Sequence, residues 1–343
     1  MTFEIVSILK ILALTTISFI LAMGLTPMLT HVLYRYKLGK QIRDEASAPI
    51  FHKLHAKKAG TPTMGGIIVW GTVLLLAIAF TFYKPLDFIT RSETLLPLGA
   101  LIASACVGLI DDYLNVRRIG PHGGGLRMRH RLMIYTAIAA VGAWWFYSKL
   151  DWDLIHVPFA GDFTVGLWYI PIFLFIIVAT SFSVNQTDGL DGLAGGTLLT
   201  SFGAYGAIAL LQGKYDLAAF CAVIIGALLA FLWFNIHPAR FFMGDTGSMS
   251  LGVTLGIIAM LTNQVLLLPI IGIIFVLESL STIIQLVSKK LFKRKVFLSS
   301  PIHHHLEATG WIEPKIVMRF WVISIVAAAL GVMIALLDRG ITL

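Results

Sequence analysis

The chain has 343 residues, of which 57% are hydrophobic and 13% are charged, and its mean hydropathy is +0.86. Soluble globular proteins carry about a quarter charged residues, and disordered chains are poor in hydrophobic ones, so both classes are excluded. The two cysteines, Cys106 and Cys221, lie in apolar runs and cannot form a disulfide framework. The composition therefore indicates a protein that crosses a membrane several times, as one integral domain over residues 1–343.

Apolar stretches of membrane-spanning length recur along the whole chain. A helix needs about 20 residues to cross the hydrocarbon core, and a backbone in lipid must satisfy its own hydrogen bonds, which favours helices. No small-residue cleavage pattern follows the first stretch, so we expect it to be retained rather than removed as a signal peptide. We predict an all-α integral membrane protein with ten transmembrane helices, at residues 11–29, 64–83, 95–110, 132–147, 167–184, 193–211, 217–234, 249–261, 265–287 and 316–337.

The positive charges fall on one side of this map. Of the 26 lysines and arginines, 20 lie in loops on the same side, mostly in residues 35–58, 117–131 and 289–319. Cytoplasmic loops hold the positive excess, so this side is predicted to be cytoplasmic and both termini periplasmic. A basic surface attracts anionic membrane lipids and phosphorylated substrates. Nucleic acid is excluded as a partner, because no stacking aromatics interleave the basic residues on a soluble module.

Several carboxylates gather at the predicted cytoplasmic helix ends. Asp111 and Asp112 are expected to close the third helix, where negative charge opposes the helix dipole. Adjacent carboxylates at the membrane edge repel each other unless a cation or a shared proton relieves them. A divalent metal is the natural partner, and a solvated pair of headgroup-level charges is the alternative.

Two glycine-containing loops carry further polar residues. Asn185, Asp188 and Asp191 lie where glycines open a helix, so backbone N–H groups there can face a phosphate. The spacing of the two aspartates resembles an EF-hand loop, but the bidentate Glu that ends such a loop is absent. Asp245 precedes the eighth helix, where it also suits an N-cap, and Phe242 is able to stack on a base or a sugar.

Three more features suit anion binding. His303, His304 and His305 are expected in the last cytoplasmic loop, where consecutive side chains point apart and so favour phosphate contacts over one zinc ion. Lys58 precedes a Thr-Pro-Thr turn and two glycines, which suits a diphosphate or, alternatively, a lipid headgroup. Glu278 lies inside an apolar run. An ionisable residue within a membrane segment usually has a function, although neighbouring hydroxyl groups could instead form hydrogen bonds with its carboxylate.

The motifs DDYLNV, NQTDGLDGLAGG, FFMGDTGS and PIHHHLE occur in this order, with GTPTMGG after the first basic loop. Together they resemble the phospho-N-acetylmuramoyl-pentapeptide-transferase family, within the polyprenyl-phosphate N-acetylhexosamine-1-phosphate transferase superfamily. The resemblance covers nearly the whole chain and its ten-helix plan. It implies Mg²⁺-dependent transfer of phospho-N-acetylmuramoyl-pentapeptide from its UDP carrier to undecaprenyl phosphate, with release of UMP. It also implies a bacterial inner membrane location, with the active site facing the cytoplasm.

The resemblance carries roles to particular residues. Asp111, Asp112, Asp245 and His303 match catalytic positions, and Asp245 with Asp112 would hold Mg²⁺. Arg129 falls where the family pattern has a Lys; its planar fork differs from a point charge, which leaves its role open. The substrate-binding positions are Lys58, Thr63, Arg129, Asn185, Asp188, Asp191, Asn235, Phe242, Gly244, His304 and His305.

Two chemical routes are open. In one, the lipid phosphate attacks directly and Asp111 receives any proton. In the other, an aspartyl-phosphate forms first. The donor is the muramoyl-pentapeptide nucleotide or another UDP-N-acetylhexosamine. A cation-coupled transporter is the rival of a different class, although transporters place such groups near the bilayer midplane. A homodimer is open.

Overall fold

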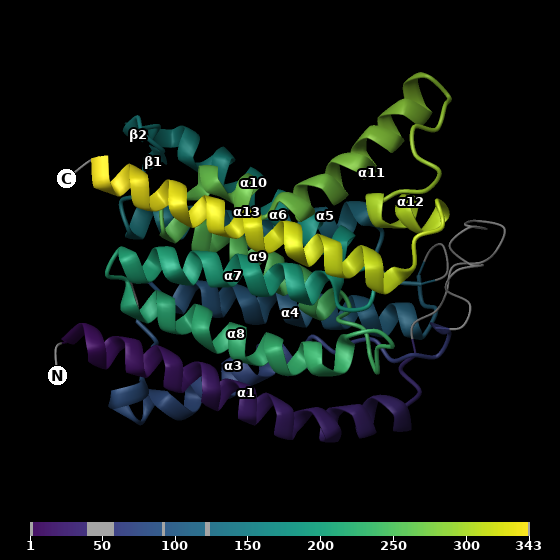
Figure 1. Cartoon of the computed structure of the whole chain (residues 1–343), viewed down its shortest axis with the longest axis horizontal. Helices are drawn as coiled ribbons and strands as arrows, with labels where there is room; N and C mark the ends of the chain where they lie inside the picture. The colour runs from purple at the N-terminus through teal and green to yellow at the C-terminus, as the bar shows by residue number, and fades with distance from the viewer. Residues whose placement is uncertain (1–2, 40–57, 91–92, 121–123, 342–343) are drawn as a thin grey trace.

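The computed structural model describes residues 3–39, 58–90, 93–120 and 124–341. Its long helices lie roughly along one axis, and the chain passes back and forth between the two ends of the bundle (Figure 1). Both termini lie at the same end. The long helices are α1 (Phe3–Arg35), α3 (Ile67–Thr81), α4 (Leu95–Val116), α5 (Met128–Lys149), α6 (Tyr169–Thr187), α7 (Leu193–Leu211), α8 (Tyr215–Asn235), α9 (Asp245–Leu261), α11 (Ile273–Leu291) and α13 (Glu313–Ile341).

Nine of the ten predicted apolar runs overlap a single long helix of this bundle, and the run at residues 265–287 is divided among three elements. Among the described residues, six helices are long and apolar enough to cross a membrane, and a bent pair makes up to seven. Two more helices, α3 and α9, are apolar but shorter. A mostly helical protein that passes a membrane several times is therefore confirmed, while the number of ten spans and the sides of the termini stay predictions.

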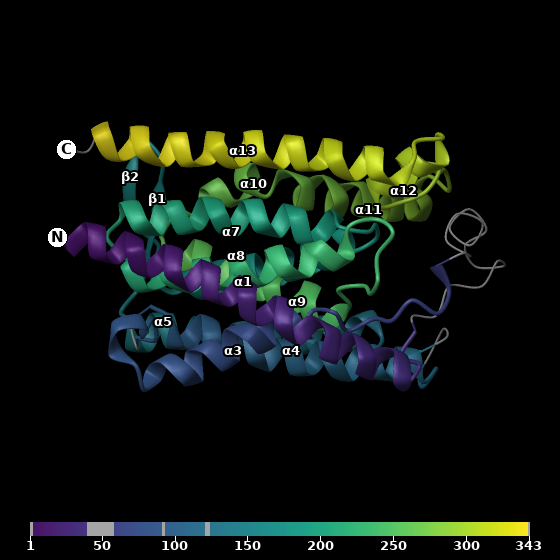
Figure 2. The same ribbon diagram turned by 60° about the horizontal axis from the view of Figure 1, so that its bottom comes forward.

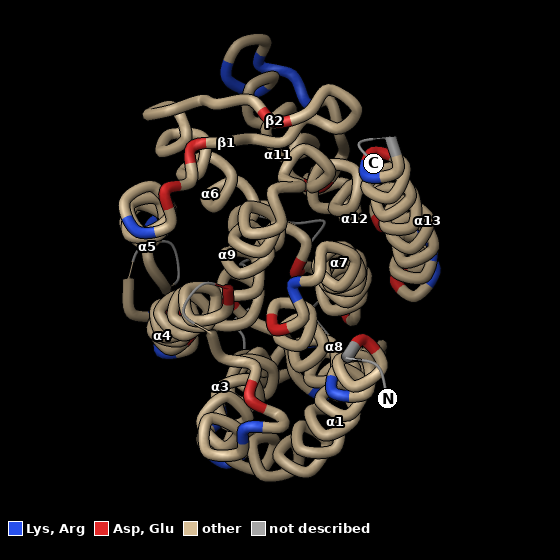
Figure 3. The backbone as a smooth tube through the Cα atoms, turned by 90° about the vertical axis from the view of Figure 1, so that its left-hand side faces the viewer, with Lys and Arg blue, Asp and Glu red and all other residues tan. Residues whose placement is uncertain are grey.

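Helix α9 forms the centre of the bundle. All of its 17 residues except Asp245 are buried, and the view along the axis shows the other helices around it (Figure 3). Small residues let backbones approach closely in such bundles, and a side chain at Gly108 of α4 would collide with the main-chain carbonyl of Asp245. The end of α4 and the start of α9 are thereby held in contact.

The predicted ninth helix, residues 265–287, is broken in the structure. It divides into a 3-10 turn η5 (Val265–Leu267), a short α10 (Leu268–Ile271) and α11, and the axis bends by 81°. Pro269 is the second residue of α10, and Gly272 has non-helical angles, φ −98 and ψ 32. Helix α11 consequently slopes away from the bundle toward the short helix α12 (Ile302–Ala308) (Figure 1).

The prediction of an all-α chain misses one small sheet. Strands β1 (Leu154–Val157) and β2 (Gly161–Thr164) form an antiparallel hairpin in which His156 pairs with Asp162. The hairpin lies at the bundle end that carries both termini (Figure 2). Short 3-10 turns, η2 (Lys84–Leu86) and η4 (Gly166–Trp168), complete the connections.

Candidate active site

Asp111 and Asp112 lie inside α4 rather than at its end. The helix continues to Val116, which corrects the predicted boundary, and the two residues are only 1% and 6% exposed. Asp112 Oδ2 accepts a hydrogen bond from the Thr246 main-chain N–H at 3.0 Å, and its Oδ1 accepts from the Thr63 hydroxyl at 3.3 Å. Asp112 therefore ties α4 to the start of α9 and to the segment before α3.

Arg131 links two of the carboxylates. Its Nε lies 2.5 Å from Asp111 Oδ2, and its Nη1 lies 3.1 Å from Asp245 Oδ2. Asp111 Oδ1 also accepts from the Leu126 main-chain N–H at 2.6 Å. One guanidinium thus lies between carboxylates of two helices that are more than 130 residues apart in the chain.

Asp245 is the first residue of α9, and Gly244 is the N-cap. Asn185 Nδ2 donates to Asp245 Oδ1 at 2.7 Å and to Ser248 Oγ at 3.1 Å. Gly244 has a φ of +75 and donates its N–H to Asp188 Oδ2 at 3.1 Å. Because this backbone conformation favours glycine, Gly244 lets the loop turn directly over the carboxylates.

Backbone pairing holds the Lys58–Gly66 segment beside the loop before α9. The Phe242 N–H donates to the Pro62 carbonyl at 2.8 Å, and Gly65 N–H donates back to the Phe242 carbonyl at 2.8 Å. Gly66 N–H bonds the Met243 carbonyl at 2.9 Å. The segment that follows Lys58 and the loop that precedes Asp245 therefore meet at one place.

A second cluster surrounds Asp191, at the same bundle end. Lys58 Nζ lies 2.7 Å from Asp191 Oδ1 and 2.6 Å from Glu313 Oε1. His237 Nδ1 lies 2.9 Å from Asp191 Oδ2, and Lys58 Nζ is 5.9 Å from the centroid of the Phe242 ring. The predicted residues Lys58, Asp191 and Phe242 are thus brought together.

Asn235 links the α6–α7 loop to the loop before α9 by two hydrogen bonds. Its Oδ1 accepts from the Gly192 N–H at 3.0 Å, and its Nδ2 donates to the Phe241 carbonyl at 2.8 Å. It is 5% exposed. Phe241 is fully buried, and Phe242 is half-buried.

The three consecutive histidines form part of helix α12, not of a loop as predicted. His303 is fully buried, and its Nδ1 lies 2.8 Å from Glu278 Oε2. His304 Nδ1 lies 2.7 Å from Glu307 Oε2, and the Leu298 N–H donates to His305 Nδ1 at 3.2 Å. In these contacts each histidine bonds a different group.

Comparison with known proteins decides the family. Residues 94–263 match the model of Glycosyl transferase family 4. The chain is 41% identical to the phospho-N-acetylmuramoyl-pentapeptide-transferase of Chloroflexus aggregans over 96% of this chain and 90% of that protein. It is 42% identical to the protein of that name in Geobacillus kaustophilus over 93% and 95% of the two chains. The chain belongs to the phospho-N-acetylmuramoyl-pentapeptide-transferase family.

The matched part of the family model contains the acids of α4, the α6–α7 loop and the start of α9. Lys58, Thr63 and the histidines of α12 lie outside residues 94–263. The relatives nevertheless match over nearly the whole chain, so the family assignment extends to these segments.

The donor chemistry at the α4–α9 junction fits a magnesium ion. Mg²⁺ prefers carboxylate and other oxygen ligands, and Asp111, Asp112 and Asp245 meet there with Asp188 bound to the adjoining turn. Within the described ranges, the group of three metal-ligating side chains whose atoms lie within 4.8 Å of one another is instead Asp191, His237 and Glu313. Lys58 already bonds two of those three. Its ammonium group therefore balances the negative charge of this second cluster without a metal ion.

Sequence reasoning missed Arg131, and a helical signal for it exists. The predicted Arg129 is exposed. Arg131 lies on the stripe of α5 that continues through the buried residues Tyr135, Ala139 and Phe146, which are spaced to share one helix face. Glu313 and His237 were missed too. Glu313 lies at the start of α13, where an acid is usually explained by compensation of the helix dipole.

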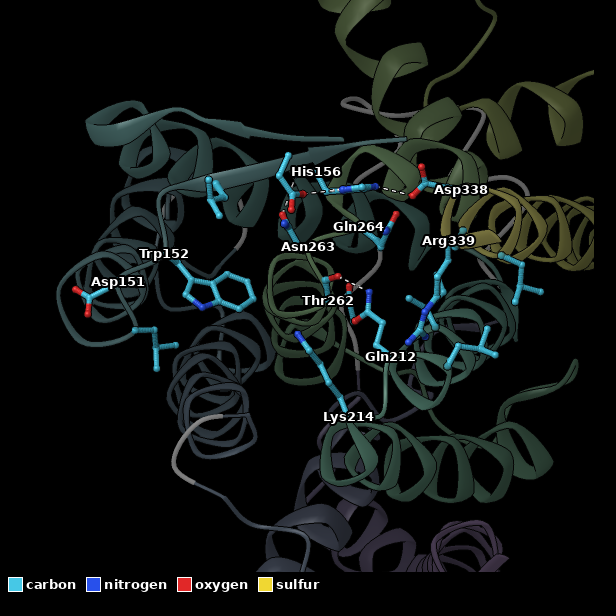
Figure 4. A pocket seen from close by; sticks show the side chains of 17 residues that line it. Asp151, Trp152, His156, Gln212, Lys214, Thr262, Asn263, Gln264, Asp338 and Arg339 are labelled. Carbon is cyan, nitrogen blue, oxygen red and sulfur yellow. Dashed lines mark hydrogen bonds and ion pairs between the residues drawn. The ribbon is translucent and has the colours of Figure 1, made fainter. Parts of the chain in front are cut away.

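A cavity of about 600 Å³ lies elsewhere, at the end with the termini. Figure 4 shows His156, Gln212, Lys214 and Asp338 around it. None of the predicted site residues lines it. This cavity is therefore separate from the residues that the sequence predicts for the site.

Proposed function

We propose that the protein transfers phospho-N-acetylmuramoyl-pentapeptide from UDP to undecaprenyl phosphate and releases UMP. The observation that carries the proposal is the meeting of Asp111, Asp112, Asp188 and Asp245, from three distant segments, around one turn. The names of the relatives match this reaction. We propose that the bundle end opposite the termini faces the cytoplasm and that the protein lies in a bacterial inner membrane. The excess of Lys and Arg in the loops at this end supports the orientation.

Each group has a task in the proposed reaction. An oxygen of the lipid phosphate attacks the sugar-bound phosphorus, the bond to the UMP oxygen breaks, and UMP leaves. Asp111 accepts any proton carried by the lipid phosphate, while Arg131 keeps Asp111 and Asp245 in place. Asn185 orients Asp245 through its 2.7 Å hydrogen bond.

We propose Mg²⁺ as the cofactor, held by Asp245 and Asp112. When bound there, Mg²⁺ supplies positive charge that neutralises the diphosphate and the leaving UMP. Lys58, beside Phe242, is placed to meet the nucleotide part of the donor. A phosphate there competes with Asp191 and Glu313 for Lys58.

Release of UMP by the purified protein tests the proposal. Wild type should release UMP from the pentapeptide donor only when undecaprenyl phosphate and Mg²⁺ are present, and Asp111→Asn and Asp112→Asn should each lose most of this rate. Release from UDP-N-acetylglucosamine but not from the pentapeptide donor would assign a different substrate.

Isotope exchange separates the two chemical routes. Exchange of labelled UMP into the donor without lipid phosphate requires a covalent intermediate on the enzyme. We expect no such exchange, because the proposed attack is direct.

A further inference from the structure

Glu278 is a carboxylate buried in an apolar helix. It is 0% exposed within α11, and a buried carboxylate is costly unless it is paired and hydrogen-bonded. The hydroxyls expected to satisfy it bond main-chain atoms instead: Ser281 and Thr282 donate to the Glu278 carbonyl at 2.8 and 3.2 Å. Ser279 donates to the Phe275 carbonyl at 2.8 Å and also bonds the Ser183 hydroxyl. The side chain of Glu278 is thus held by something outside its own helix.

Its partner is His303, which α12 brings against α11. His303 is also 0% exposed, and its Nδ1 lies 2.8 Å from Glu278 Oε2. The other polar atom of each group, Glu278 Oε1 and His303 Nε2, is buried with no hydrogen-bond partner in the part of the chain that the structure describes. Buried polar atoms are normally bonded, so such an exception calls for an explanation.

Nε2 of His303 faces the α6–α7 loop, which carries Asp188 and Asp191. A side chain at Gly189 would collide with His303 Nε2, and its three nearest atoms would all belong to the His303 ring. Gly189 follows Asp188, which accepts the Gly244 N–H next to Asp245. Glycine at 189 therefore leaves room for the imidazole edge beside the proposed phosphate site.

We propose that Glu278 is a positioning residue for His303. By accepting a hydrogen bond from Nδ1–H, Glu278 fixes the ring orientation and balances the charge of an imidazolium ring, whose Nε2–H then donates to a phosphate oxygen of the substrates. A carboxylate that holds one nitrogen of a histidine commonly sets the tautomer and orientation of the other. The inference rests on the function proposed above and adds to it the device that holds the histidine.

Glu278→Gln tests the pairing, because it keeps the side-chain volume and removes the charge. Loss of such an orienting group typically costs 10–100-fold, so we expect kcat for UMP release to fall on the order of 100-fold. The KM for the UDP donor should stay within about twofold, since only the reacting arrangement is disturbed. A KM change with unaltered kcat would contradict the proposal.

A double-variant comparison shows whether Glu278 acts through His303. If it does, Glu278→Gln should cost nothing further in the His303→Gln background, because residues acting as a unit are not additive. Losses that multiply would assign Glu278 a separate structural role. Ser281→Ala is the matched control, since it removes a buried contact of the same turn, and it should keep kcat.

Two further measurements test the proposal if the Glu278 variant does not fold or if the wild type shows no UMP release. If Glu278→Gln does not fold, Gly189→Ala replaces it: the added methyl should lower kcat in wild type and have no effect in the His303→Ala background. Ring-¹⁵N NMR of the full chain should show His303 protonated at Nδ1 in wild type and changed in Glu278→Leu, whose side chain cannot accept this hydrogen bond. An unchanged signal would refute the pairing, whereas an inactive wild type with this signal intact would refute only the proposed function.

Discussion

The two ends of the bundle use the same residue types differently. At the end with the termini, charges pair across neighbouring elements: Lys10 of α1 lies 2.9 Å from Asp216 of α8. At the opposite end one arginine lies between Asp111 and Asp245. The first arrangement joins helices, while the second gathers carboxylates into one buried network. Concentration of acids, rather than the presence of charge, distinguishes the proposed site.

Arg131→Gln should produce the largest effect. It leaves Asp111 and Asp245 without the cation between them, and breaking a buried ion pair costs about 3–5 kcal/mol. We expect the free energy of unfolding to fall by about 3 kcal/mol and UMP release to fall more than about 100-fold. Denaturant unfolding in detergent and the UMP assay measure both.

Arg129→Gln sharpens this prediction, because Arg129 is exposed in the same helix turn. Its loss of activity should be smaller than that of Arg131→Gln. Equal losses would show that the contacts of Arg131 carry no special weight.

Glu313→Gln should have a smaller effect, on substrate binding. Glu313 Oε1 accepts the Asp191 N–H at 2.7 Å and bonds Lys58 at 2.6 Å, so the variant loosens the cluster proposed to meet the nucleotide. We expect the KM for the UDP donor to rise about tenfold, equivalent to about 1.4 kcal/mol, with less change in kcat. Initial rates at varied donor concentration measure this, and a fall in kcat alone would move Glu313 to the reacting groups.

Asp216→Asn, at the end with the termini, should change stability and not activity. The Lys10 and Asp216 side chains are 19% and 30% exposed, and partly exposed ion pairs contribute about 0.2–1 kcal/mol. The thermal midpoint in detergent should fall by roughly 2 °C, with kcat unchanged. Loss of catalysis would remove the distinction between the two ends.

His156 provides the smallest effect, through pH. Burial opposes its charge, but hydrogen bonds to Asp162 and Asp338 outweigh burial and raise the pKa of His156 above its ordinary value. A raised folded-state pKa contributes stability that is complete below about pH 6.5 and disappears as pH rises through the folded-state pKa. The difference in thermal midpoint between wild type and His156→Gln should therefore shrink on going to alkaline pH. A difference that grows with pH would contradict this reading.

The positions of the helices could be predicted because every membrane-crossing segment must be apolar, and nine of the ten predicted runs overlap a single long helix. The break at Gly272 was hidden by the same apolar composition, although Pro269 and Gly272 are signals for it. The hairpin was missed because its strands have only four residues each.

The site could be predicted only in part. The sequence places Asp111, Asp188 and Asp245 at one membrane level, and the structure finds their segments in contact. Contacts between distant segments, such as Arg131 with Asp245, are not encoded in local spacing. The partner of Glu278 is likewise 25 residues away in another helix. The catalytic and metal-binding roles of these residues stay predictions.

The Mg²⁺ dependence of UMP release by Asp245→Asn, measured beside Asp216→Asn, tests the central claim most directly. Asp245→Asn should release almost no UMP at any Mg²⁺ concentration that saturates wild type, while Asp216→Asn should follow the wild-type curve. If Asp245→Asn kept the wild-type rate and the wild-type Mg²⁺ response, the reaction would not take place at the carboxylates between α4 and α9.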